Sequence, residues 1–213
     1  AAQGKVQMAL RPLADHDACE VIVATVEQHG LLYKLAGAFA ISGISIVDAR
    51  LNTFQNGLAL DTFWVQTTEK RMPNIQNIRT PLYKNIVRTL SDGCDIEAEL
   101  MRKWPSWAPR TEIFTVTPLV RINNNGSSKC TIIEVIGRDR PGLVSQLAKV
   151  VSDLNLRIEF AKISTYGEAA TDVFYAKDSF GMKIYHEKKI AQLTDALYTV
   201  LHKANTPHVR KSA

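Results

Sequence analysis

The sequence is poor in cysteine and has no long apolar run. Its three cysteines, Cys19, Cys94 and Cys130, are far apart and show no CxxC spacing, which argues against a disulfide framework and a structural zinc site. No apolar run approaches the roughly 18 residues that a membrane-spanning helix needs, and the N-terminus lacks a signal-peptide pattern. We therefore expect a cytoplasmic protein with reduced cysteines and no membrane contact. The opening residues look like mid-chain sequence without an initiator methionine, which indicates a piece of a longer protein.

Positive charge is in modest excess, but it is not concentrated. The 213 residues carry a formal net charge of +5, and 46% of them are apolar. This composition is typical of a soluble globular protein with two units of about 100 residues each. The densest basic clusters are only pairs, such as Lys188 with Lys189. A solvated surface is therefore favoured over a nucleic-acid-binding face.

The sequence contains an internal repeat. GLLYKLAGAFAISGISIVDARLNTF, from Gly30, aligns without gaps onto GLVSQLAKVVSDLNLRIEFAKISTY, from Gly142. Shortening the next turn by one residue aligns DTFWV, from Asp61, with DVFYA, from Asp172. The chain is therefore a tandem duplication, and each copy is expected to fold in the same way.

Each copy shows the same order of elements. A β-rich run, CEVIVATV from Cys19 or CTIIEVIG from Cys130, precedes a segment with apolar residues at helical spacing. A hairpin with a Gly turn and a second amphipathic helix follow. The order βαββαβ indicates an α+β fold with two ferredoxin-like repeats, each an antiparallel sheet covered on one face by two helices.

The second helix and the closing strands need separate predictions. Proline inside a helix would break it, so we expect Thr80 as the N-cap and Pro81 at the first helical position. Ile75 and Ile78 would then form a separate short turn. The run EIFTVTPLVRI, from Glu112, is expected to close the first repeat. The second repeat lacks an obvious closing strand of its own. We expect either NTPHVRK near the C-terminus or GKVQMALRP near the N-terminus to supply it.

The predicted division of the chain follows from these elements. Asn123 to Ser128 form a turn-rich linker between the repeats. Trp104 and Trp107 are expected to be packing anchors rather than a ligand cage. The predicted units are an N-terminal segment, 1–17, considered as a swapped strand; a first repeat, 18–122, with an insertion at 94–110; a linker, 123–129; and a second repeat, 130–213.

The motif RDRPGL, residues 138–143, lies at a strand-to-helix junction. Pro141 suits a first helical turn, and Gly142 allows the backbone or a ligand to approach closely. The free N–H groups of that turn attract a carboxylate, while Asp139 is placed to hold an ammonium group. An α-amino acid carries one of each. The alternative is that Asp139 caps the helix and Gly142 only relieves crowding.

The motif is part of a longer resemblance. Asp-x-Pro-Gly-Leu at the first helix, together with ISTYGE and DVFY, resembles the ACT domain. With SIVDARLNTF, GLALDTFWVQ and IFTVTPLVRI, most of the chain from 18 to 203 resembles the C-terminal ACT pair of the bacterial PII uridylyltransferase/uridylyl-removing enzyme family. This resemblance implies a regulatory module for nitrogen signalling that senses glutamine and reports to upstream catalytic domains. It also implies PII protein as a partner through the parent enzyme and Mg²⁺ as that enzyme's cofactor.

The chain itself is not expected to catalyse. It has no Gly-Ser run followed by spaced aspartates, which a nucleotidyltransferase needs to hold Mg²⁺ at a triphosphate. His16, with Asp15 and Asp17, gives a DHD sequence without the other ligands of a hydrolytic HD domain. We therefore expect no catalytic residue, no metal site and no cofactor in this chain. ACT sheets usually pair side by side, so the two repeats are expected to pair within the chain, with a second chain as a further candidate partner.

The resemblance assigns the ligand site to two loops. The second copy keeps the family pattern, whereas the first has Glu27 for the aspartate and His29 for the proline. We therefore expect the second loop to bind the amino acid and the first to be weaker or empty, with His29 a loop residue. Arg157, near the second loop in sequence, is a candidate carboxylate partner. The candidate ligand-binding residues are Asp139, Arg140, Pro141, Gly142, Leu143, Arg157, Glu27, Gln28, Gly30 and Leu31.

Two other functions remain open from the sequence. A stand-alone ACT pair that senses a metabolite or binds a protein fits the same residues. RNA-recognition modules share the βαββαβ order, and Phe63–Trp64 and Phe174–Tyr175 place aromatics on a strand of each copy. Adjacent strand residues face opposite sides, however, and the first strands carry no aromatic residue. An RNA-binding function is therefore disfavoured.

Overall fold

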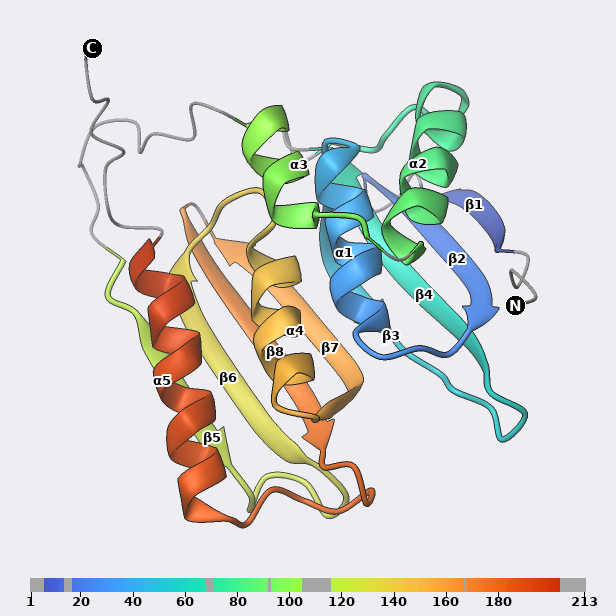
Figure 1. The fold of residues 1–213 in the computed structure, drawn as a ribbon. Coiled ribbons are helices and arrows are strands. Elements are labelled where there is room, and N and C mark those ends of the chain that lie inside the picture. Colours follow the sequence, from blue (N-terminus) through green and yellow to red (C-terminus); the bar gives the residue numbers. More distant parts are fainter. Residues whose placement is uncertain are drawn as a thin grey trace.

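The strands form one continuous antiparallel sheet in this computed structural model (Figure 1). The structure describes residues 6–13, 17–67, 71–91, 93–104, 116–166 and 168–203. The strand order is β1-β2-β4-β3-β7-β8-β6-β5. The strands are β1 Gln7–Leu13, β2 Ala18–Val26, β3 Ile44–Arg50, β4 Leu58–Thr67, β5 Leu119–Asn123, β6 Thr131–Arg138, β7 Arg157–Tyr166 and β8 Ala169–Lys177.

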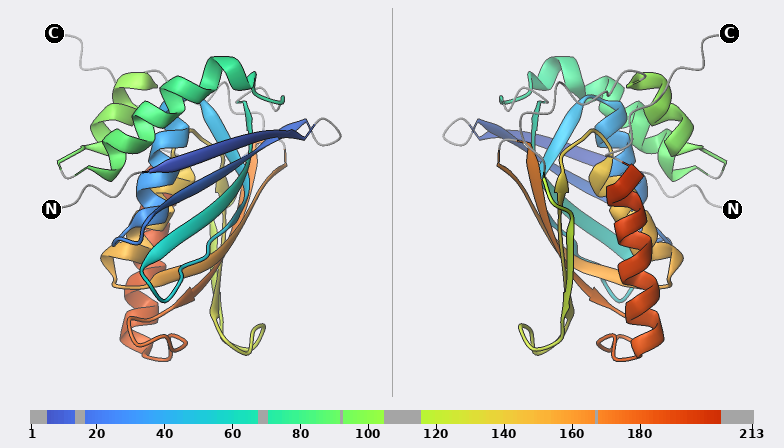
Figure 2. Two further views of the ribbon diagram at one scale, coloured as in Figure 1. Left: turned by 90° about the vertical axis from the view of Figure 1, so that its right-hand side faces the viewer. Right: turned by 90° about the vertical axis from the view of Figure 1, so that its left-hand side faces the viewer.

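The helices of the described residues all cover one face of this sheet, and none of them lies on the other face (Figure 2). They are α1 Leu31–Ile41, α2 Ile75–Leu90, α3 Ile96–Lys103, α4 Leu143–Asp153 and α5 Glu187–Lys203. The core lies between the two layers. Phe39 of α1 and Phe63 of β4 are fully buried with ring centroids 4.9 Å apart, and Leu147 of α4 and Phe174 of β8 occupy the same layer in the second repeat. The predicted α+β architecture is confirmed.

The two repeats are related by a pseudo-two-fold axis. Strand β3 pairs with β7 in a register that places Ala49 directly opposite Ala161. These two alanines are aligned with each other in the sequence repeat, so the axis passes between them. On the helical side, α1 and α4 pack together, and the Ser145 hydroxyl donates a hydrogen bond of 2.9 Å to the Tyr33 carbonyl. The predicted side-by-side pairing within one chain is confirmed.

The prediction for the edge strands was wrong in its pairing. Strand β5, which was expected to close the first repeat, pairs with β6 at the edge of the second repeat. The N-terminal strand β1 pairs instead with β2 of the first repeat. Each repeat thus receives its edge strand from the segment that precedes it. Residues 112–115 and the segment NTPHVRK lie outside the described residues.

The start of the second helix was also predicted wrongly. Helix α2 begins at Ile75 and runs through Pro81. Its N-cap is Asn74, whose side chain accepts a hydrogen bond of 3.1 Å from the Gln76 N–H. A proline inside a helix costs about 3 kcal/mol, and the packing of Ile75 and Ile78 against the core offsets this cost. Tertiary burial therefore extends the helix beyond the predicted boundary.

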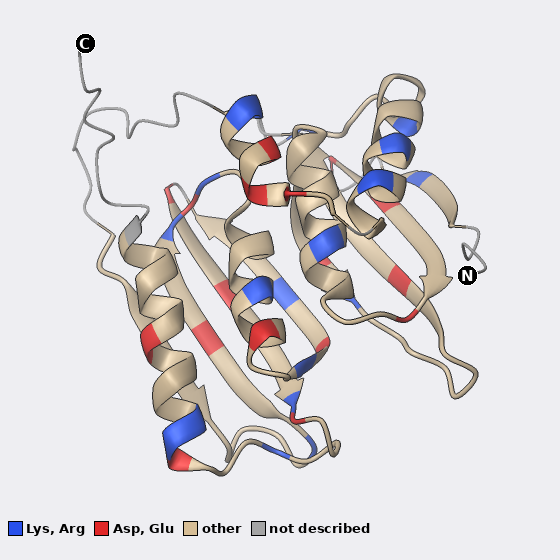
Figure 3. Ribbon diagram, viewed as in Figure 1, with Lys and Arg blue, Asp and Glu red and all other residues tan. Residues whose placement is uncertain are grey.

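The open face of the sheet carries one aromatic residue of each predicted pair. Phe63 and Phe174 are fully buried on the helical side, so Trp64 and Tyr175 lie on the helix-free side. The Arg50 guanidinium lies 5.5 Å from the centre of the Trp64 ring. Seen from the helical side, basic and acidic positions are interspersed over both repeats (Figure 3), as expected for a solvated surface.

Candidate functional site

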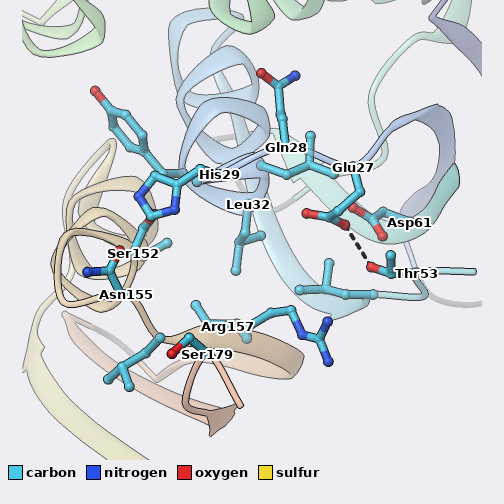
Figure 4. A pocket seen from close by; sticks show the side chains of 17 residues that line it. Glu27, Gln28, His29, Leu32, Thr53, Asp61, Ser152, Asn155, Arg157 and Ser179 are labelled. Carbon is cyan, nitrogen blue, oxygen red and sulfur yellow. Dashed lines mark hydrogen bonds between the residues drawn. The ribbon is translucent and has the colours of Figure 1, made fainter. Parts of the chain in front are cut away.

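A cavity of about 410 Å³ lies at the junction of the two repeats (Figure 4). One wall is the loop between β2 and α1, the floor is the β3–β4 hairpin, and the other wall is the end of α4 with the start of β7. The lining residues are Glu27, Gln28, His29, Gly30, Leu31, Leu32, Tyr33, Leu51, Thr53, Asp61, Ala148, Ser152, Asn155, Leu156, Arg157, Ile158 and Ser179.

The first wall presents the N-terminus of α1. Gly30 takes a left-handed conformation, with φ of 70°, and is the N-cap residue. The Leu31 N–H donates to the Gln28 carbonyl at 3.1 Å. The next two N–H groups, of Leu32 and Tyr33, have no backbone acceptor among the described residues. A helix N-terminus with unsatisfied N–H groups favours a bound anion.

Two carboxylates lie beside this helix end. Glu27 accepts a hydrogen bond of 2.7 Å from the Thr53 hydroxyl. Asp61 is only 3% exposed, and it accepts a hydrogen bond of 3.1 Å from the Asn52 N–H. Burial is the main cause that raises the pKa of Asp61 to about 7; the Asn52 hydrogen bond opposes this shift, and the nearby charge of Glu27 adds to it. The cavity therefore has an acidic corner whose charge changes near neutral pH.

The second wall comes from the other repeat. The Ser152 hydroxyl lies 2.9 Å from the His29 Nε2, so a hydrogen bond joins the two repeats across the cavity. Asn155 takes a positive φ of 53° at the turn after α4. Arg157 lies at the mouth, exposed, and forms an ion pair of 2.7 Å with Glu159. His29 was expected to be a loop residue; it is exposed in that loop and also reaches the opposite wall.

The structure divides the predicted site residues between two junctions. Glu27, Gln28, Gly30 and Leu31 line the cavity, and Arg157 lines it with them rather than joining the second loop. The residues Asp139, Arg140, Pro141, Gly142 and Leu143 lie at the symmetry-related junction. The ligand assignment itself stays a prediction, but the cavity opens at the first loop.

The second junction is covered by α3. Gly142 has a φ of 82° and lies so close to Leu100 that an added Cβ would be 2.7 Å from the Leu100 Cδ1. Helix α4 begins at Leu143 with Gly142 as its N-cap, so Pro141 precedes the helix and was wrongly placed inside its first turn. The N-cap residue Gly142 has no side chain with which to cap α4, and the alternative of an Asp139 cap stays a prediction.

The polar groups at the second junction point to different partners. The guanidinium of Arg140 donates to Gln146 and, at 3.3 Å, to the Val200 carbonyl. Burial lowers the pKa of Arg140, while the charges of Asp139 and Glu97 oppose this shift. The Asp139 N–H donates to the Glu168 carbonyl at 2.8 Å. Arg140 is therefore held toward α5 by its neighbours.

The close contact of Gly142 with α3 gives a first prediction. Gly142→Ala is expected to destabilise the fold by about 1–3 kcal/mol more than Gly43→Ala, because the new methyl group collides with Leu100. Gly43 is the matched control, since its φ is 76° but nothing lies within 4 Å of its Cβ position. Urea denaturation measures both, and Leu100→Ala should remove most of the difference. Equal losses would show that α3 does not press on Gly142.

Sequence reasoning missed much of the cavity. Thr53, Asp61, Ser152 and Asn155 line it, yet none was a candidate. Asp61 had a visible signal, since it is a lone acid among the alternate positions that face the core in β4. The residues of the second repeat had no local signal, because they reach the first loop only through the pairing of β3 with β7.

Neither a metal cluster nor a spanning helix occurs in the described part of the chain. Its histidines, cysteines and carboxylates nowhere gather in groups of three or more that could hold an ion. None of its helices is long and apolar enough to cross a membrane. Trp104, one of the two predicted packing anchors, packs beside α3 and donates to the Ala40 carbonyl at 3.2 Å; Trp107 lies outside the described residues.

Comparison with known proteins gives an ACT-domain match and relatives that share one name. Residues 126–204 match the ACR family N-terminal ACT domain. The chain is 40% identical over 192 residues to the bifunctional uridylyltransferase/uridylyl-removing enzyme of Rhodospirillum rubrum, covering 90% of this chain and 20% of that protein. It is 44% identical over 183 residues to the enzyme of the same name from Azospirillum brasilense, covering 85% and 20%. The chain thus spans about a fifth of the length of these relatives.

A solved structure shows a weaker likeness. Aspartate kinase from Synechocystis has a TM-score of 0.43 at 13% identity, covering 89% of this chain and 27% of that chain. This level of similarity is too low to assign a function. The sequence relatives and the family match to residues 126–204 are the findings that identify the kind of domain.

Proposed function

Since residues 126–204 belong to the ACT-domain family, we propose that this chain is the amino-acid-sensing regulatory part of a bifunctional uridylyltransferase/uridylyl-removing enzyme. The observation that carries the proposal is the cavity between the repeats, with a helix N-terminus and two carboxylates in it. Its volume of about 410 Å³ is at the small end of the range for ligand sites. A free amino acid of glutamine's size fits this range.

The two charged ends of an amino acid have separate partners in the cavity. The α-carboxylate is placed at the first turn of α1, on the N–H groups of Leu32 and Tyr33. The ammonium group is placed at Glu27, with Asp61 behind it. The sequence favoured the second loop for the ligand, but Leu100 fills that junction. The proposal therefore places the ligand at the first loop.

Glutamine is the proposed ligand because the resemblance to the ACT pair implies it and because the far wall is polar. Ser152 and Asn155 present a hydroxyl and an amide there. These groups can donate to and accept from a side-chain amide. A carboxylate side chain, as in glutamate, would meet the Asn155 amide equally but would add a negative charge near Glu27. We therefore expect glutamine to bind more tightly than glutamate.

Titration calorimetry tests this function. L-Glutamine should bind the chain with one site, and the analogue that lacks the α-amino group should bind at least tenfold more weakly, because Glu27 then has no ammonium partner. D-Glutamine is the control for stereochemistry. Absence of binding heat with L-glutamine would contradict the proposed ligand.

The raised pKa of Asp61 gives a prediction for pH. Asp61 is largely neutral at pH 6 and largely charged at pH 8, since its pKa is about 7. A charged carboxylate attracts the ligand's ammonium group, so glutamine affinity is expected to rise as the pH increases from 6 to 8. Asp61→Asn should remove most of this rise while leaving binding at pH 6 nearly unchanged. Calorimetry at the two pH values measures it; an affinity that falls toward pH 8 would contradict the ammonium assignment.

The regulatory proposal also covers the rest of such an enzyme. The catalytic uridylyl transfer and removal, with Mg²⁺ as cofactor and PII protein as substrate, belong to other parts of the proposed parent. This chain alone is expected neither to uridylylate nor to deuridylylate PII with UTP and Mg²⁺. An activity that increases in proportion to the purified chain would contradict the proposed role.

A further inference from the structure

The two junctions of the pseudo-two-fold pair differ in what fills them. At the first, Gly30 faces the end of α4, where an added Cβ would lie 3.2 Å from the Ser152 hydroxyl, and the cavity is open. At the second, the equivalent Gly142 faces Leu100 of α3. Ala40, the counterpart of Ser152, accepts the hydrogen bond from Trp104. Helix α3 therefore lies where the first junction has its cavity, above the start of α4 (Figure 1).

Helix α3 is a small element with a small apolar contact. Its buried side chains, Ile96 and Leu100, form a separate cluster with Ala40 and Ile41 of α1. The Asp95 side chain caps it by accepting from the Ala98 N–H at 3.0 Å. The remaining described attachments include an exposed ion pair of 2.9 Å between Arg88 of α2 and Glu99. Because α3 has few buried contacts, its local opening requires less free energy than unfolding of the core.

The second junction keeps the polar groups that the first uses. Asp139 is aligned with Glu27, and Asp172 of β8 is aligned with Asp61. Asp172 is 1% exposed, and both of its carboxyl oxygens lack a hydrogen-bond partner among the described residues. Burial, with the nearby charge of Asp139, raises the pKa of Asp172 well above its ordinary value. A buried carboxyl group without a hydrogen-bond partner is unusual in a junction whose only role is the packing of side chains.

We propose that the second junction is a second amino-acid site, for the same class of ligand, and that α3 covers it. The site is latent because α3 occupies the space where the ligand would bind. The proposal rests on the proposed function of the open cavity. Leu100 stands over the N-terminus of α4, where the ligand's α-carboxylate would lie. Asp139 would take the ammonium group, as Glu27 does at the first junction. The chain thus has one open site and one site that α3 closes.

The number of bound ligands tests this directly, with L-glutamine as the probe. The chain as it stands should bind one glutamine. Replacing residues 95–104 with a Gly-Ser linker of equal length, in the otherwise full chain, should give two. Adding Asp139→Asn to the linker variant should weaken only the second site, by about tenfold or more, and Glu27→Gln should weaken only the first.

Point variants keep the test decisive if the linker variant does not fold. Leu100→Ala should loosen α3 and reveal a second, weaker site. Met101→Ala is the matched control, because Met101 is 63% exposed on the same helix and should leave one site. One site in the parent and in every folded variant would overturn the proposal that α3 covers a second site, but it would leave the proposed function unchanged. Two sites in the parent also overturn it, and no binding in any form overturns the proposed function itself.

Discussion

Glu27→Gln is expected to weaken glutamine binding about tenfold to a hundredfold. The substitution keeps the size of the side chain and its hydrogen bond with Thr53, but removes the charge that faces the ligand's ammonium group. A charge-assisted hydrogen bond contributes about 1.5–3 kcal/mol, which corresponds to this change in affinity. Titration calorimetry at pH 8 measures it, because Asp61 is then charged in the parent and in the variant.

Asp139→Asn is the matched control for Glu27→Gln. Asp139 holds the equivalent position at the second junction, where α3 covers the helix N-terminus. Its substitution should therefore change glutamine affinity less than about twofold in the unmodified chain. The sequence alone predicts the opposite ranking. A larger loss at Asp139 than at Glu27 would show that the ligand enters the second junction despite Leu100.

Asp172→Asn is expected to stabilise the protein above neutral pH. The folded state holds the Asp172 pKa well above its ordinary value, so folding favours the protonated form. Stability from this group is fully present below about pH 4, the ordinary value for aspartate, and is lost as the pH rises toward the folded pKa. Asparagine is neutral at all pH values and avoids this loss. We expect a gain in stability at pH 8 and almost none at pH 4.

Urea denaturation between pH 4 and pH 8 measures this effect. Asp195→Asn provides the control, because Asp195 is exposed on α5 and its substitution should leave the pH dependence unchanged. Stabilities of the parent and of Asp172→Asn that differ by the same amount at every pH would contradict a buried neutral carboxyl group. A loss of stability at pH 8 would show that the charged form has a partner in the folded protein.

The local pattern of the sequence was sufficient for the repeated unit. The gapless alignment from Gly30 onto Gly142 placed two helices of equal length, Leu31–Ile41 and Leu143–Asp153, and the hairpins that follow them. These elements are short-range, so periodicity and turn residues determine them. Pro81 is the exception, since burial of Ile75 and Ile78 outweighs the local penalty.

The edge strands depended on information that the sequence does not hold locally. The strand Leu119–Asn123 reads equally well as the last strand of one repeat or the first strand of the next. Its antiparallel register with β6, where Val120 lies opposite Val135, is a long-range choice. The same holds for β1. A repeat unit found by alignment therefore fixes the elements but not which neighbour supplies the edge.

The lining of the cavity was half predictable for the same reason. Glu27, Gln28, Gly30 and Leu31 belong to one loop, so their motif predicted them together, and their role in binding a ligand stays a prediction. Arg157 was found too, but it was grouped with the wrong loop because it is near Gly142 in sequence. The two-fold pairing through Ala49 and Ala161 carries Arg157 to the opposite junction. Likewise, no local pattern indicates that α3 would cover the better-matched loop.

Amide chemical shifts during a glutamine titration test most directly whether the ligand binds at the open junction. Binding at the N-terminus of α1 should shift the amide signals of Leu31, Leu32 and Tyr33 most strongly, with Ser152 and Asn155 following from the other wall. The signals of Leu143 and Val144 should stay nearly constant. Large shifts at Leu143 and Val144 with constant signals at Leu31 and Leu32 would contradict the site proposed here.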